Sequence, residues 1–290
     1  MHDTLSSLVE RALTGNRRAL EFYLRDNSRL PGPRANLELA YDVSHLLAAA
    51  IPRHPDNVYA LLNYLANGDR KPVASNTPAE FTMLCGVIAY GVCAAAHTDW
   101  RDETFQILNH YACSPSWRVR EGVAIAYQQL LNADPQSALA QLLRLATQGD
   151  CLQQRAAVAA VAEPPVLYNA DVCAAALEIQ RIVLERLRAV PADERKKNEQ
   201  FRLLRRTLGY TLSVVTAAEP ERGFALMREC AAWQDGDIRW ILRENLGKKR
   251  LAKFVEERKN VGSLLEQSRA RSQQDLLPDP QSSPRSEDAR

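Results

Sequence analysis

Apolar residues recur at intervals of three and four along almost the whole chain, which is the spacing of one face of an α-helix. The clearest stripe consists of Phe201, Leu204, Leu208, Leu212 and Val215. Long alternation of apolar and polar residues, which would indicate strands, does not occur. The pattern therefore predicts an all-α protein.

Proline and N-cap residues divide this pattern into helices of one to two dozen residues. Thr77 and Pro78 form a typical start, with Glu80 at the capping-box position. Short linkers between amphipathic helices are typical of antiparallel packing. The expected helices span residues 3–14, 17–28, 35–51, 56–67, 78–97, 99–112, 115–132, 135–147, 150–162, 169–189, 192–217, 220–233 and 237–258.

The pattern changes near the C-terminus. From Lys259 onward the chain is rich in Ser, Gln, Arg, Asp and Pro and poor in aromatic residues. Such a composition cannot bury enough apolar surface to order the chain. We predict a disordered tail over residues 261–290. It is better explained as a terminus without a binding role than as a short docking segment, for which Leu276 and Leu277 would be the only apolar anchor.

A short motif, W-x-x-R-E, occurs at Trp117 and again at Trp240. The segment that begins at Leu152 aligns with the first copy 35 residues later and places Arg155 under Arg120. The copy with Trp240 and Arg243 follows 88 residues after that, which leaves room for two more units. Repeats of about 40–47 residues with two helices each are typical of HEAT and armadillo proteins.

The segments "WRVREGVAIA", "LQQRAAVAAV" and "WILRENLGKK" resemble the second helix of a HEAT repeat. They are also distantly similar to HEAT-like DNA alkylation-repair glycosylases. The resemblance implies an α-α superhelix whose repeats cover residues 98–260, preceded by a helical region, 1–97, that caps or diverges from them. It also implies a concave face able to bind a partner, which in the glycosylases is lined with aromatic and basic residues.

Charge and composition add constraints. The net charge is only +2, but residues 191–260 contain 16 Lys and Arg against 11 Asp and Glu. This local excess allows an anionic partner. The start of the chain does not resemble a signal peptide, and the longest apolar run, Met83–Ala96, is too short to span a bilayer. With six scattered cysteines and no C-x-x-C pair, we expect reduced thiols, a cytoplasmic location and no membrane partner.

The tryptophan and arginine of the repeat allow two interpretations. They can seal the junction between stacked helices, or the arginines can form a ladder along one face that meets phosphates or an acidic partner. A second cluster of basic residues on the expected helices 192–217 and 237–258 is either a solvated face or a phosphate-binding patch. The candidate partner-binding residues are Trp117, Arg120, Arg155, Arg202, Arg206, Trp240, Arg243, Lys248, Lys249 and Arg250.

Two other groups of residues combine side chains with possible chemical roles. Cys93 and His97 share one helix face and His110 and Cys113 another, a donor set that suits zinc, but ordinary packing explains them better. Asp99, Trp100 and Asp102 place an aromatic ring beside carboxylates, as a glycosylase requires, although Asp99 is more simply an N-cap. We expect neither a metal nor a cofactor.

Motifs of P-loop enzymes, α/β-hydrolases, zinc proteases and Rossmann enzymes are absent. The sequence favours a non-catalytic scaffold that binds a macromolecule, with protein as the expected partner. The alternatives are a glycosylase that acts on alkylated bases and a non-catalytic DNA or RNA binder.

Overall fold

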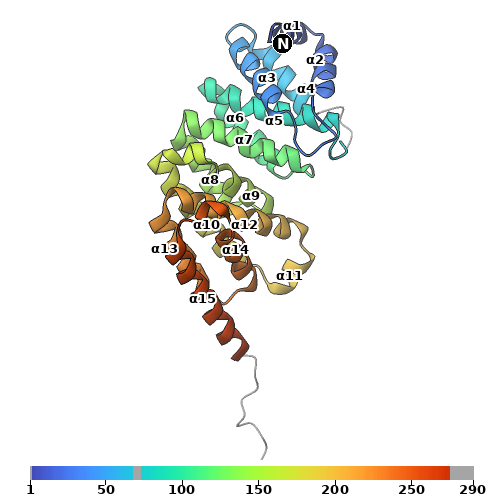
Figure 1. The fold of residues 1–290 in the computed structure, drawn as a ribbon. Coiled ribbons are helices and arrows are strands. Elements are labelled where there is room, and N and C mark those ends of the chain that lie inside the picture. Colours follow the sequence, from blue (N-terminus) through green and yellow to red (C-terminus); the bar gives the residue numbers. More distant parts are fainter. Residues whose placement is uncertain (1, 68–72, 275–290) are drawn as a thin grey trace, which may run out of the picture.

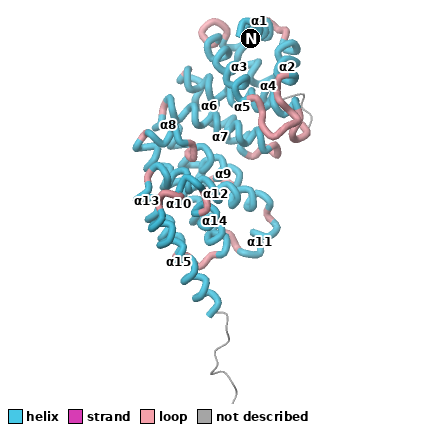
Figure 2. The backbone as a smooth tube through the Cα atoms, viewed as in Figure 1, coloured by secondary structure: helices cyan, strands magenta, loops and turns pink. Residues whose placement is uncertain are grey.

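A computed structural model describes residues 2–67 and 73–274 of the chain, which contain fifteen α-helices and no strand (Figures 1 and 2). The prediction of an all-α protein is confirmed. Three short 3-10 turns, η1 (Thr98–Trp100), η2 (Pro164–Tyr168) and η3 (Lys249–Leu251), lie between helices. The helices are α1 (His2–Leu13), α2 (Arg17–Asp26), α3 (Leu37–Ala50), α4 (Pro55–Asn67), α5 (Pro78–Ala96), α6 (Arg101–Ala112), α7 (Trp117–Ala133), α8 (Pro135–Gln148), α9 (Cys151–Ala160), α10 (Ala170–Ala189), α11 (Ala192–Lys197), α12 (Glu199–Ala218), α13 (Pro220–Ala231), α14 (Gly236–Leu246) and α15 (Val255–Gln274).

The helices stack into an elongated array with α1 at one end and α15 at the other (Figure 1). In one layer each helix contacts the next, in the order α3, α5, α7, α9, α12 and α14. Helices α8, α10, α13 and α15 follow one another in the same way on the other side. A single apolar core runs from Leu5 to Leu265, so helices α1 to α5 share their core with the helices that follow.

Helix α5 joins the N-terminal helices to the rest of the array. It contains the long apolar run, and in the described part of the chain it alone is long and apolar enough to cross a bilayer. Most of that run is buried between α3, α4 and α7. The run is therefore part of a buried core helix.

The contact between α5 and α7 depends on a glycine. A Cβ atom added at Gly91 would lie 2.5 Å from the Cα of Ala126. Backbone cannot rotate out of the way as a flexible side chain can, so the two helices would have to move apart.

Gly91→Ala is expected to lower the free energy of unfolding by about 1–3 kcal/mol, the usual cost of overpacking. Gly262→Ala in α15 is the matched control, because a Cβ there meets nothing within 4 Å. Alanine favours a helix by about 1 kcal/mol over glycine, so this control should be neutral or stabilising. Urea denaturation measures both, and equal stability of the two variants would contradict the close helix contact.

Two predicted helices are wrong in extent. The expected helix 192–217 is interrupted at Asn198, whose side chain accepts a hydrogen bond from the Phe201 amide and starts α12. The expected helix 237–258 ends at Leu246, and α15 begins only at Val255.

The predicted start of the disordered tail is also wrong, because α15 continues through residues 261–274. Val261 and Leu265 lie one turn apart and are buried against the core, and α15 packs on α13. The rest of the predicted tail, with Leu276 and Leu277, lies outside the described residues.

Candidate functional site

Two adjoining cavities open along the face formed by α7, α9 and α12. The first has a volume of about 430 Å³ and lies between the start of α3, α7, α9 and α12. The second has a volume of about 630 Å³ and lies between η2, α12 and η3. Because Ala162, Glu163 and Tyr210 line both, the cavities form one continuous depression, which we call the α7–α12 groove.

The first residues of α7 form one wall of the groove. The Ser116 side chain accepts a hydrogen bond from the Val119 amide and fixes the helix start, so Trp117 is the first helical residue. The indole is 41% exposed, and the Arg118 guanidinium carbon lies 4.4 Å from its ring centre. Glu121 lies one helical turn further on and also lines the groove.

Burial raises the pKa of Glu121, although Arg118 and Arg155 favour its charged form. Folding therefore opposes ionisation of this carboxyl group. A carboxyl group held in this way inside a depression is typical of functional sites.

Glu121→Gln is expected to increase the free energy of unfolding at neutral pH. Because the folded pKa is raised, wild-type stability falls as pH rises through the range between the unfolded and folded values, whereas the variant loses nothing there. The advantage should vanish as pH falls below about 4, where the wild-type carboxyl becomes protonated in both states. Urea denaturation at a series of pH values checks this. If the variant is less stable than wild type at neutral pH, the attraction of Glu121 to Arg118 and Arg155 is larger than the free-energy cost of burying its charge.

Arg155 projects from α9 into the groove, and its Nη1 atom is buried without a hydrogen-bond partner. Burial lowers the pKa of Arg155, while Tyr210 and Glu121 favour its charged form. The guanidinium remains charged at neutral pH. Arg155 thus lines the same cavity as Trp117 and Tyr210 with a charged guanidinium that makes no hydrogen bond to a described residue.

Tyr210 stands between the two cavities. Burial raises the pKa of its phenol, and charges of both signs surround it: Arg155 and Arg250 favour the ionised form, whereas Glu121 and Glu163 oppose it. The groove therefore combines exposed aromatic rings with alternating positive and negative groups. Tyr168 at the edge of the second cavity is 89% exposed.

Arg120 does not belong to this groove. Its side chain is buried, and Nη1 donates to the carbonyl oxygens of Ser114 and, at 2.9 Å, Pro115 in the loop before α7. In α9 the buried Gln154 makes the matching bond, donating from Nε2 to the Gly149 carbonyl at 2.8 Å. Each residue lies four positions after its N-cap, which are Ser116 and Asp150.

The predicted alignment of α7 with α9 is therefore wrong by one residue. Arg120 corresponds to Gln154, and Arg155 corresponds to Glu121, five positions after the N-cap. What recurs is a polar side chain that folds back and satisfies carbonyl groups of the preceding loop.

Arg120→Ala is expected to lower the free energy of unfolding by about 1–3 kcal/mol, because the loop carbonyls lose their donor. Arg155→Ala serves as the matched control, since the structure gives Arg155 no hydrogen bond to any described residue; its effect should stay below about 1 kcal/mol. Urea denaturation compares the two. Equal losses would mean that Arg155 also supports the fold.

The third copy of the motif lies in a different setting. Trp240 is the fifth residue of α14, not the first, and its ring packs under the Arg205 guanidinium at 3.8 Å and against Gly209. Arg243 pairs with Glu266 of α15 at 2.7 Å. The three arginines therefore do not form the predicted ladder along one face. Arg120 donates to loop carbonyls, Arg155 lines the groove and Arg243 pairs with a glutamate of another helix.

Three members of the basic cluster are paired with acids in the same region. Arg195 contacts Asp235 at 2.8 Å and Asp237 at 3.0 Å, and Arg205 contacts Asp237 at 2.7 Å. Lys248 lies 3.6 Å from Glu244.

Four other candidate basic residues are exposed, and only one of them, Arg250, lines the groove. Arg202 and Arg206 make no ion pair with the described residues and lie two turns and one turn before Tyr210 on the same side of α12. Arg250 lines the second cavity, whereas Lys249 is exposed beside it.

The zinc hypothesis gains no support from the geometry. His97 Nε2 lies 3.1 Å from the Ala48 carbonyl oxygen, Cys93 is buried in α5, and Cys113 donates to Asp150. Across residues 2–67 and 73–274, no three His, Cys, Asp or Glu side chains are arranged to hold a metal ion.

The Asp99 grouping is also not assembled. Asp99 and Asp102 are exposed, and Trp100 packs edge-on against Tyr59. The prediction that Asp99 is an N-cap is wrong, because neither η1 nor α6 has a side-chain cap.

A buried ion pair that the sequence analysis missed lies behind the groove. Arg118 and Glu80 are 2% and 0% exposed, and Arg118 Nε lies 3.3 Å from Glu80 Oε2. Arg118 also donates to the Gly32 carbonyl oxygen at 2.7 Å, and Glu80 accepts from the Asn76 amide at 2.8 Å. The pair connects the 27–36 loop, the start of α5 and the start of α7.

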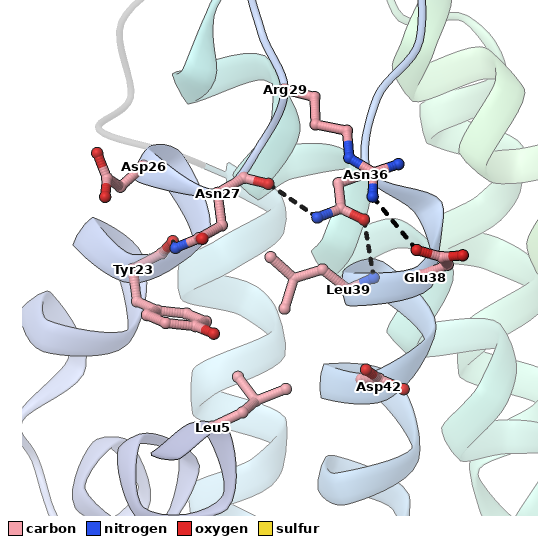
Figure 3. A pocket seen from close by; sticks show the side chains of 9 residues that line it. All are labelled: Leu5, Tyr23, Asp26, Asn27, Arg29, Asn36, Glu38, Leu39 and Asp42. Carbon is pink, nitrogen blue, oxygen red and sulfur yellow. Dashed lines mark hydrogen bonds and ion pairs between the residues drawn. The ribbon is translucent and has the colours of Figure 1, made fainter. Parts of the chain in front are cut away.

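A separate cavity of about 470 Å³ lies between α1, α2 and α3 (Figure 3). Its polar groups are used locally: Asn36 donates to the Asn27 carbonyl oxygen and accepts from the Leu39 amide. Asp26 lies on one wall, whereas Glu38 and Asp42 lie on the other. The carboxylates do not converge on one point, so this cavity is a weaker candidate than the groove.

Comparisons with models of protein families, with curated proteins and with solved structures found no match. Function must therefore be inferred from the groove itself.

Proposed function

We propose that this chain is a non-catalytic scaffold of stacked, HEAT-like helices that binds a protein partner in the α7–α12 groove. The observation that carries the proposal is the groove itself, where the exposed rings of Trp117 and Tyr168 adjoin the buried donor of Arg155. Aromatic and arginine side chains in a depression are the usual energetic anchors of protein interfaces.

The charge pattern supports a protein partner over a nucleic acid. Glu121 and Glu163 line the groove and would repel phosphates. Asp235, Asp237 and Glu244 also occupy Arg195, Arg205 and Lys248, so these three basic side chains are not free for phosphates. A protein can match charges of both signs, whereas a phosphate chain cannot.

The test is capture of partners by the immobilised full-length chain from a lysate of its own organism, with and without nuclease. The proposal expects a protein that is retained after nuclease treatment and whose capture does not fall steeply between about 50 and 200 mM salt. Retention of nucleic acid alone would overturn the proposal and favour the nucleic-acid binder.

A glycosylase remains the second candidate, because the groove places Glu121, with its raised pKa, one turn from the exposed indole of Trp117. Such enzymes need a carboxylate near the sugar and an aromatic ring near the base. We expect no release of modified bases from alkylated DNA. If modified bases are released and Glu121→Gln abolishes this release, the protein is a glycosylase and the scaffold proposal is wrong.

A further inference from the structure

We propose that the α7–α12 groove recognises a polypeptide segment that places a carboxylate on Arg155 and an apolar side chain in the cavity beside Tyr168. This inference rests on the proposed function and specifies the chemistry of the partner. Its two anchor points come from two different observations on the two cavities.

The first anchor is the unused donor of Arg155. Arg155 lines the first cavity, and its Nη1 atom, a terminal nitrogen with two N–H groups, has no acceptor among the described residues. Burying a charged donor without a partner costs free energy, and a ligand that supplies the acceptor recovers it. A carboxylate fits best because it can accept two parallel hydrogen bonds from a guanidinium.

The second anchor is the apolar lining of the neighbouring cavity. Its walls come from η2 and α12 and include Pro164, Leu167, Val214, Ala217 and Ala218. The cavity has room for one large side chain, and Tyr168 stands exposed at its edge. Burying a leucine or phenylalanine here removes apolar surface from water, which favours binding.

The two anchors lie close enough for one short segment. Tyr210, Glu163 and Ala162 line both cavities, so no helix separates them. In an extended chain, residues two apart point to the same side and lie about 7 Å apart. We therefore expect the acidic and apolar residues to be two to four positions apart in the partner.

The remaining charges favour a peptide carboxylate over a nucleic acid. Glu121 and Glu163 line the first cavity together with Arg155, and Glu121 favours the charged form of Arg155. A single carboxylate is balanced by Arg155, whereas a sugar-phosphate chain would bring one charge per nucleotide past both glutamates.

The experiment is selection of random linear peptides, displayed on phage, against the folded full-length chain. We expect enriched sequences with Asp or Glu two to four residues from Leu, Ile, Phe or Met. A synthetic peptide of the enriched sequence should bind about tenfold or more weakly when its Asp or Glu is replaced by Asn or Gln. The unchanged peptide should lose a similar affinity for the Arg155→Gln protein. Arg202→Gln, an exposed arginine outside both cavities, is the matched control and should leave affinity unchanged.

The substitution in the peptide keeps the test valid even if Arg155→Gln fails to fold. Three results would overturn the inference. The enriched peptides could lack an acid, or replacing their acid by the amide could leave affinity unchanged. Alternatively, single-stranded oligothymidylate could bind more tightly than the peptide in a way that depends on Arg155. If the natural partner still binds the groove in that case, the proposed function stands and only the carboxylate recognition fails.

Discussion

Arg118→Ala is expected to lower the free energy of unfolding by about 3–5 kcal/mol, the usual cost of removing one member of a buried ion pair. The substitution leaves the fully buried Glu80 carboxylate without its cation and the Gly32 carbonyl without its donor. Three segments lose their connection at once, so the 27–36 loop should also become susceptible to proteolysis. Urea denaturation and limited proteolysis measure the two effects.

Arg202→Ala is the matched control for this prediction. It removes an exposed arginine from the surface of α12 and should change stability by no more than about 0.5 kcal/mol. An Arg118→Ala protein within 1 kcal/mol of wild type, by the scale usual for a buried pair, would contradict the assigned role.

The combined Trp117→Ala and Tyr210→Ala change is expected to weaken binding of the natural partner by more than about tenfold. Each ring lines the groove, and truncation of an aromatic anchor at an interface commonly costs about 2 kcal/mol or more. Both side chains are about 40% exposed, so stability should change much less than binding. Binding of the captured partner, measured by calorimetry alongside thermal unfolding, separates the two effects.

Phe22→Ala provides the control for the aromatic pair. Phe22 is a 75% exposed ring on α2 that lines neither cavity of the groove. Unchanged affinity in the Trp117 and Tyr210 double variant, or equal loss in Phe22→Ala, would mean that the partner binds elsewhere.

The sequence predicted local structure well where one segment determined it. Thr77 caps α5 as expected, since its hydroxyl accepts from the Glu80 amide. The same pattern did not reveal where the Glu80 carboxylate goes. The carboxylate accepts a hydrogen bond from the Asn76 amide and pairs with Arg118. Because Arg118 lies in α7, this ion pair forms only when α5 and α7 pack together.

The repeat motif shows the same limit. Matching identical residues in the two segments aligned Arg120 with Arg155. Equivalent positions in two helices are counted from their N-caps, which are Ser116 and Asp150, and this count shifts the alignment by one residue. A search for the caps, rather than for the tryptophan, would have paired Arg120 with Gln154. One position on a helix is a rotation of about 100°, enough to exchange a buried residue for a groove residue.

Composition misled the prediction of the tail. Residues 261–274 are mostly polar, but Val261 and Leu265 alone place an apolar contact at helical spacing. The groove could be predicted only in part: Trp117 and Arg155 were candidates, whereas Tyr210, Glu163 and Tyr168 come together only through stacking of separate helices.

The most direct test of the proposed binding face is photo-crosslinking from within the groove. A photoreactive amino acid replaces Tyr210 in one protein and Phe22 in another, and each is irradiated with the captured partner. The account predicts a crosslinked complex from position 210 and none from position 22. Crosslinking from position 22 with none from position 210 would contradict the assignment of the α7–α12 groove as the binding site.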